Sequence, residues 1–136
     1  MNRGVATGAT ALLAVITVAN VGLWASRADN SDASSWLSTH RTLCDAAERA
    51  DAGQFAAARR IFYDGAHESL HKLARRVQKT SRGQAARLLE RKERVETALE
   101  QPTAQLSDQL RALARSTRAA SAAVGEPIGA RCSAAP

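Results

Sequence analysis

Residues 103–124 read TAQLSDQLRALARSTRAASAAV and decide the fold class. Side chains that are apolar or small recur in this stretch at steps of three and four, at Leu106, Leu110, Leu113, Thr117, Ala120 and Val124. That spacing places them on one face of an α-helix. Pro102 marks the beginning of the stretch, and Gly125 with Pro127 marks its end. The sequence therefore predicts an amphipathic helix whose apolar face must be covered by other elements.

Three earlier stretches show the same periodicity, at residues 34–50, 54–79 and 82–100. Their apolar faces consist of Trp36, Leu37, His40, Leu43, Cys44 and Ala47, then Phe55, Phe62, Ala66, Leu70, Leu73 and Val77, then Ala85, Leu88, Leu89, Val95 and Leu99. The alternation typical of a strand is missing from the sequence. Because the connections are short, we expect an all-α fold in the form of a small up-down four-helix bundle.

Local signals support these helix boundaries. Gly53 is expected to end the first helix, and Ser81 with Gln84 forms a capping-box pattern in front of the third. Gly65 interrupts the second helix, where glycine costs about 1 kcal/mol relative to alanine unless another group must approach closely.

An uncharged segment covers residues 5–25. As a helix it would span roughly 31 Å, about the thickness of a membrane's hydrocarbon core. It is either an uncleaved anchor or a signal segment cut after Ser26-Arg27-Ala28, and its length favours the anchor, because signal cores usually contain about 7–15 residues. Arg3 and the amino terminus favour a cytoplasmic N-terminus. We therefore expect residues 1–28 to be a single N-terminal transmembrane or signal helix, followed by a tether at 29–33 and an extracytoplasmic bundle at 34–124, which is secreted or periplasmic if cleavage occurs.

The chain contains two cysteines, Cys44 and Cys132. In an oxidising compartment, such a pair in a small helical domain favours a disulfide. This bond would tie the C-terminal tail, residues 125–136, back to the first helix of the bundle. Two free thiols, or Cys44 as a metal ligand, are the alternatives.

Residues 67–71 spell His-Glu-Ser-Leu-His, which is the H-E-x-x-H spacing of the zincin metalloproteases. The resemblance covers these five residues only. It would imply zinc bound by His67 and His71 and a catalytic role for Glu68, but a zincin also needs a substrate-binding strand and a third ligand from a later element. The sequence predicts no strand and has no histidine after His71. A diiron centre is also disfavoured, since Glu68-x-x-His71 has no second copy. We therefore expect a protein that is not an enzyme.

A metal site without protease activity remains an alternative. In a helical hairpin that turns near residue 52, His40 lies level with residue 65, and a turn near residue 81 brings Glu96 level with His67. The predicted ligands of one transition metal ion, Zn, Cu, Ni or Fe, are therefore His67, His71, His40, Asp64 and Glu96. The competing interpretation is ordinary charge pairing, with Glu96 bound to Lys92 at i,i+4 and His40 bonded to a carbonyl in the core.

The composition restricts the partners. The net charge is +6 and the chain has five aromatic residues, which are not interleaved with the basic residues as a nucleic-acid stacking surface requires. With an extracytoplasmic location, this disfavours nucleic acid. The sequence predicts a membrane-anchored, non-enzymatic interaction or accessory protein that contacts the membrane through its N-terminal helix and an unidentified protein partner through its bundle.

Overall fold

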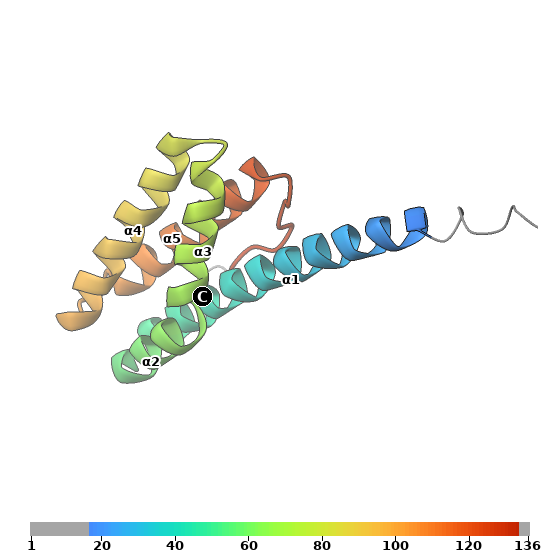
Figure 1. Ribbon diagram of the computed structural model, residues 1–136. Helices are drawn as coiled ribbons and strands as arrows, with labels where there is room; N and C mark the ends of the chain where they lie inside the picture. The colour runs from blue at the N-terminus through green and yellow to red at the C-terminus, as the bar shows by residue number, and fades with distance from the viewer. Residues whose placement is uncertain (1–16, 134–136) are drawn as a thin grey trace, which may run out of the picture. The chain divides into compact units, whose positions relative to one another are not determined.

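The computed structural model describes the backbone of residues 17–133 and the side chains of residues 32–133. Within this part of the chain the fold is all-α, as predicted, with five helices and no strand (Figure 1). The helices are α1 (Thr17–Asp51), α2 (Phe55–Gly65), α3 (His67–Gln78), α4 (Arg82–Glu100) and α5 (Leu106–Ala123). Asp32–Pro136 forms one compact unit.

The N-terminal predictions fall mostly outside the described residues. Of the uncharged segment, residues 5–16 lie outside them, and residues 17–25 belong to the backbone of α1. The backbone of residues 29–33, expected as a tether, is helical as well, so this prediction was wrong. Among the described residues, no helix combines the length and the apolar character needed to cross a membrane.

The single helix predicted at residues 54–79 is divided at Ala66 into α2 and α3. Ala66 has φ −119° and ψ −36°, outside regular helical geometry, yet its N–H still donates to the carbonyl of Phe62 and its carbonyl accepts from Leu70. The bend lies beside Gly65, where a Cβ atom would come within 2.7 Å of Thr42 Cγ2 on α1. Glycine therefore allows α1 and α2 to approach closely at the point where the chain changes direction.

The two C-terminal helices lie close to their predicted bounds. Ser81 is the N-cap of α4, and its side chain accepts a hydrogen bond from the Gln84 backbone N–H at 3.4 Å. The α5 helix begins at Leu106 rather than at 103, because Thr103 Oγ1 accepts from the Gln105 N–H in a turn that precedes the helix. Beyond α5, Gly125 has φ +81°, a left-handed conformation that glycine adopts without strain.

The core is formed by the apolar faces that the periodicity identified. α3 packs against α4, and α4 packs against α5. The largest completely buried apolar side chains are Phe62, Leu43, Leu70, Leu73, Leu88, Leu99, Leu106, Leu110, Leu113, Val77 and Val95. Each side chain of this size contributes about 1.5–3 kcal/mol when it is fully removed from water.

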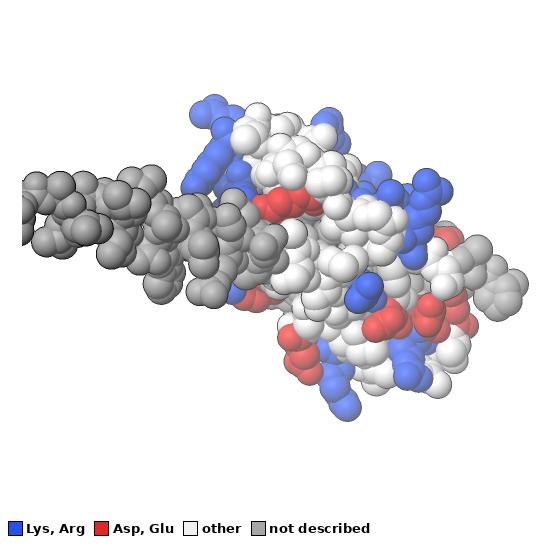
Figure 2. Space-filling model, turned by 90° about the vertical axis from the view of Figure 1, so that its right-hand side faces the viewer, with Lys and Arg blue, Asp and Glu red and all other residues white. Residues whose placement is uncertain are grey.

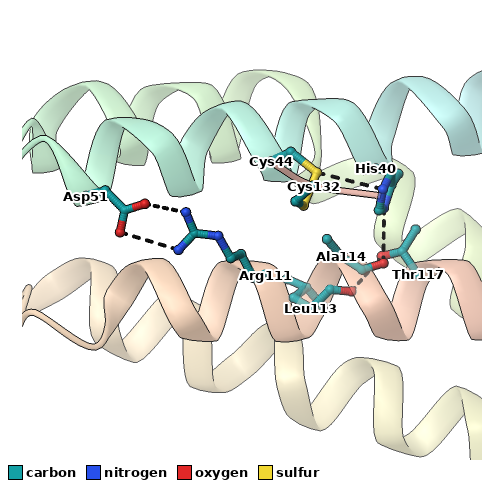
Figure 3. Close-up of a disulfide and its surroundings, with 8 residues drawn as sticks. All are labelled: His40, Cys44, Asp51, Arg111, Leu113, Ala114, Thr117 and Cys132. Carbon is teal, nitrogen blue, oxygen red and sulfur yellow. Dashed lines mark hydrogen bonds and ion pairs between the residues drawn. A yellow bond between two sulfur atoms is a disulfide. The ribbon is translucent and has the colours of Figure 1, made fainter. Parts of the chain in front are cut away.

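The C-terminal part of α1 runs antiparallel to α5. His40 contacts Ala114, whereas Asp51, eleven residues later, pairs with Arg111 (Figure 3). After α5 the chain forms a non-helical tail that returns to α1 (Figure 1), where Cys132 is joined to Cys44 by a disulfide. The structure thus pairs the two cysteines as the sequence analysis expected.

Candidate functional site

One arginine and three ring side chains form a row along α2 and the first turns of α3. The Arg59 guanidinium lies 5.7 Å from the ring centre of Tyr63, Tyr63 lies 5.5 Å from His67, and His67 lies 5.0 Å from His71. These four residues, which we call the ring ladder, are spaced by four positions, so the row continues across the bend at Ala66. Tyr63 is 36% exposed and is the one large hydrophobic side chain exposed on the described part of the chain.

Glu96 of α4 meets the ladder at His67. Its Oε1 atom lies 3.0 Å from His67 Nε2 and accepts a hydrogen bond from Lys92 Nζ at 2.8 Å. Lys92 is only 4% exposed, so its ammonium group depends on this carboxylate for compensation. Glu96 thus lies beside His67, as expected for a helical hairpin that turns near residue 81. The i,i+4 pair of Glu96 with Lys92, which the competing interpretation expected, is present as well.

The remaining predicted ligands of this cluster are His71 and Asp64. Partial burial lowers the pKa of His71, and the nearby charges of Lys92 and His67 lower it further. The imidazole is therefore neutral at pH 7, the form in which it can bind a metal. Asp64 is exposed near the end of α2.

His40 lies elsewhere, in a second cluster that consists of His40, Cys44 and Cys132 and that we call the His–Cys cluster (Figure 3). His40 is 1% exposed. Its Nδ1 lies 3.2 Å from the Ala114 carbonyl oxygen, and its Nε2 lies 3.7 Å from Cys44 Sγ. Within the described residues this is the one group of three metal-ligating side chains whose ligand atoms lie within 4.8 Å of one another. The structure therefore brings His40 to the cysteines instead of gathering all three histidines.

The hydrogen bond to Ala114 fixes the tautomer of His40. A carbonyl can only accept, so Nδ1 carries the proton and Nε2 keeps a lone pair when the ring is neutral. Burial lowers the pKa of His40, and the positive charge of Arg118 lowers it further. Hydrogen bonding to the backbone of Ala114 and Ala130 acts in the opposite direction. The neutral ring thus directs a potential ligand atom towards the cysteine sulfur.

Two features of the sequence correspond to these arrangements. Tyr63 and Arg59 stand four and eight positions before His67, which predicts a shared helix face with His67 and His71 if the helix continues through the bend. Likewise, His40 and Cys44 are one helical turn apart. The addition of Cys132 to that pair depends on the path of the tail, which periodicity does not predict.

The charged surface is mixed in sign. On the face in Figure 2, acidic and basic side chains are interspersed, without one large field of either sign. In comparisons with known proteins, no family model matches this chain, and no match was found among curated proteins or among solved structures. The proposals below therefore rest on the residues and their geometry.

Proposed function

We propose that this protein is a membrane-anchored, extracytoplasmic accessory protein that acts through protein contacts rather than through catalysis. The helices from residue 34 to residue 124 supply the contact domain as an up-down bundle. The antiparallel course of α1 along α5, and the packing of α3 on α4 and of α4 on α5, support this arrangement.

The observation that carries the proposal is the ring ladder. Tyrosine and arginine are, with tryptophan, the residues enriched at the energetic centres of protein interfaces. Tyrosine buries a large area at a small cost in conformational entropy. Tyr63 and Arg59 are both exposed, and Tyr63 is supported from below by the buried ring of Phe62 at 5.1 Å. A ring packed against the core in this way loses less conformational freedom when a partner binds.

The chemistry around the ladder favours an acidic protein partner. Arg59, Arg60 and Lys72 are exposed along α2 and α3, while the Glu68 carboxylate already faces Arg75 at 3.8 Å. A partner surface that presents carboxylates would pair with these cations and pack an apolar group on Tyr63.

Site-specific crosslinking in the producing cells tests this role. We expect p-benzoylphenylalanine in place of Tyr63 to give one discrete protein adduct, and Arg59→Glu to suppress it. The same photoprobe in place of Arg87, an exposed residue on α4, is the matched control. Equal adduct patterns at both positions, or none at residue 63, would refute the proposal.

The membrane part of the proposal rests on the uncharged residues 5–25. We expect the full chain in the membrane fraction, with the helical domain digested by protease added from the extracytoplasmic side. A soluble mature form that begins at Asp29 would replace the anchor by a cleaved signal segment.

A second candidate is transition-metal binding by His67 and His71, favoured by their 5.0 Å ring separation and by the carboxylate of Glu96 beside His67. Calorimetric titration of the full chain with zinc and copper tests it. His67→Ala should weaken binding by about tenfold or more, whereas Glu68→Gln should not, because the Glu of H-E-x-x-H is not a ligand. Titration heats equal to those of buffer would exclude this site.

A further inference from the structure

The His–Cys cluster contains the donor atoms of a metal site, with its two sulfur atoms joined to each other. Cys44 and His40 lie one turn apart on α1, and Cys132 reaches them from the tail. We propose that reduction of the Cys44–Cys132 disulfide converts this cluster into a site for a thiophilic d¹⁰ cation, Zn²⁺ or Cu⁺, bound by His40 Nε2 and the two thiolates. This site is separate from the ring ladder and does not depend on the proposed function.

The distance between the two donors on α1 already fits such a site. In tetrahedral zinc sites with Zn–S bonds of about 2.3 Å and Zn–N bonds of about 2.0–2.1 Å, the sulfur and nitrogen atoms lie about 3.5 Å apart. The observed distance from Cys44 Sγ to His40 Nε2 is 3.7 Å. Because both residues are buried on one helix, this spacing should persist when the disulfide is opened.

The orientation of His40 also fits. In metal sites, a ligating histidine usually donates its other ring N–H to a carbonyl or carboxylate, which fixes the ring and its tautomer. Here the Ala114 carbonyl, on α5, accepts from Nδ1 at 3.2 Å.

The third donor, Cys132 Sγ, belongs to the non-helical backbone of the tail. The two sulfur atoms must separate from 2.04 Å to about 3.8 Å, the spacing of two thiolates on one tetrahedral zinc. Cys132 is half-buried on the tail, so a shift of this size needs no change in a helix. Arg118 Nε donates to the Ile128 carbonyl at 3.2 Å and thus keeps the tail near α5 after reduction.

A dithiol can serve as the reductant of the Cys44–Cys132 disulfide. The dithiol gives up two electrons and two protons and becomes a disulfide, while Cys44 and Cys132 become thiols. Metal binding then displaces one proton from each thiol, and the cation keeps its oxidation state. Thiolate sulfur selects Cu⁺ and Zn²⁺ over hard cations such as Mg²⁺ and Ca²⁺.

Cobalt titration of the full chain in detergent tests the site, because a tetrahedral Co²⁺–thiolate centre absorbs in the visible and near-ultraviolet. We expect a one-to-one complex in anaerobically reduced protein, its displacement by Zn²⁺, and no cobalt–thiolate bands in the oxidised protein. Competition with a chromophoric Cu⁺ chelator then shows whether Cu⁺ or Zn²⁺ is preferred. Either preference supports the site.

Variants separate this site from other ligands. His40→Gln should weaken cobalt binding by about tenfold or more, and Cys132→Ser, on the half-buried tail, should do the same if His40→Gln does not fold. The double variant His67→Ala/His71→Ala removes the second candidate site and should keep the cobalt–thiolate bands, while the exposed-residue variant Arg87→Gln on α4 is the matched control and should bind cobalt as the unmodified chain does. Absence of binding in the reduced chain, loss of its helical circular dichroism, or cobalt–thiolate bands that disappear in the His67→Ala/His71→Ala variant would overturn the proposal.

Discussion

At the scale of single residues, the buried ionisable groups have the largest energetic consequences. His40 is enclosed between α1 and α5 and is stable there as a neutral ring, because burial opposes its protonation. Lys92 is buried as well, and Glu96 balances its charge. The first group makes stability depend on pH, and the second makes it depend on one carboxylate.

We expect the free energy of unfolding to fall as the pH is lowered through about 6.5, the pKa of a histidine in the unfolded chain. Since the folded-state pKa of His40 is lowered, the unfolded chain binds the proton first, so stability is complete above this pH and is lost progressively below it. Denaturant unfolding at pH 7.5 and 5.5 measures the loss. His40→Gln should reduce it, and an unchanged pH dependence in this variant would contradict the assignment. The Asp51 carboxylate, whose pKa is lowered by the hydrogen bond from Arg111, acts only in a lower pH range.

Glu96→Gln should destabilise the protein by about 1–3 kcal/mol, because it leaves the Lys92 ammonium buried without a counter-charge. Lys92→Met, which removes the charge and keeps the volume, should be neutral or stabilising. Urea unfolding of both variants gives the comparison. If both substitutions cost the same, the pair has no special role.

At the scale of helices, the bend between α2 and α3 lies beside Gly65, where an added Cβ atom would meet Thr42 Cγ2. Periodicity predicted the helical residues on both sides of the bend but not the bend itself, because both faces keep the same spacing across Ala66. Gly65, expected to interrupt the helix, was the one sequence signal at this position. The hairpin arithmetic also placed residue 65 close to its observed neighbour on α1. It did not predict the direction of the His40 side chain, because the position of a residue along a helical hairpin does not determine which face of the helix carries it. The His40 ring contacts Ala114 on α5.

Gly65→Ala should therefore destabilise the protein by about 1–3 kcal/mol, since the new Cβ meets Thr42 Cγ2. Thr42→Ser removes that methyl group and should restore part of the loss in the double variant. Gly83→Ala, in α4 with only the end of the Arg87 side chain at 4.0 Å, is the control and should stabilise by about 0.5–1 kcal/mol. Thermal unfolding measures all four proteins, and equal effects at the two glycines would disprove the steric argument.

At the scale of the whole molecule, contacts distant in sequence hold the tail and the first helix to the rest. Arg76 of α3 pairs with Asp32 near the start of the compact unit and with Glu126 in the tail. The disulfide joins residues 88 positions apart. The composition predicted that bond, while the ion pair between Arg76 and Glu126 depends on a tail conformation that no sequence pattern indicated.

Reduction of the disulfide should lower the melting temperature by about 10 °C or more. The chain-entropy model gives roughly 4–5 kcal/mol for a loop of this length, and in a domain of this size 1 kcal/mol corresponds to about 4–8 °C. Calorimetry with and without reductant measures the shift. The double variant Cys44→Ala/Cys132→Ala should have the melting temperature of the reduced protein, and the reductant should not change it. A melting temperature that stays constant while both thiols become alkylatable would count against the model.

The bond between Cys44 and Cys132 also closes most of the helical domain into a covalent ring. The turns at Gly53, at residues 79–81 and at residues 101–105 all lie inside this ring. A protease that cuts one of these turns opens the ring without releasing a fragment. Both pieces stay attached through sulfur, and the helices can remain packed. A protein built this way tolerates a single cut in one of these turns, because a fragment is lost only after reduction of the disulfide or after a second cut.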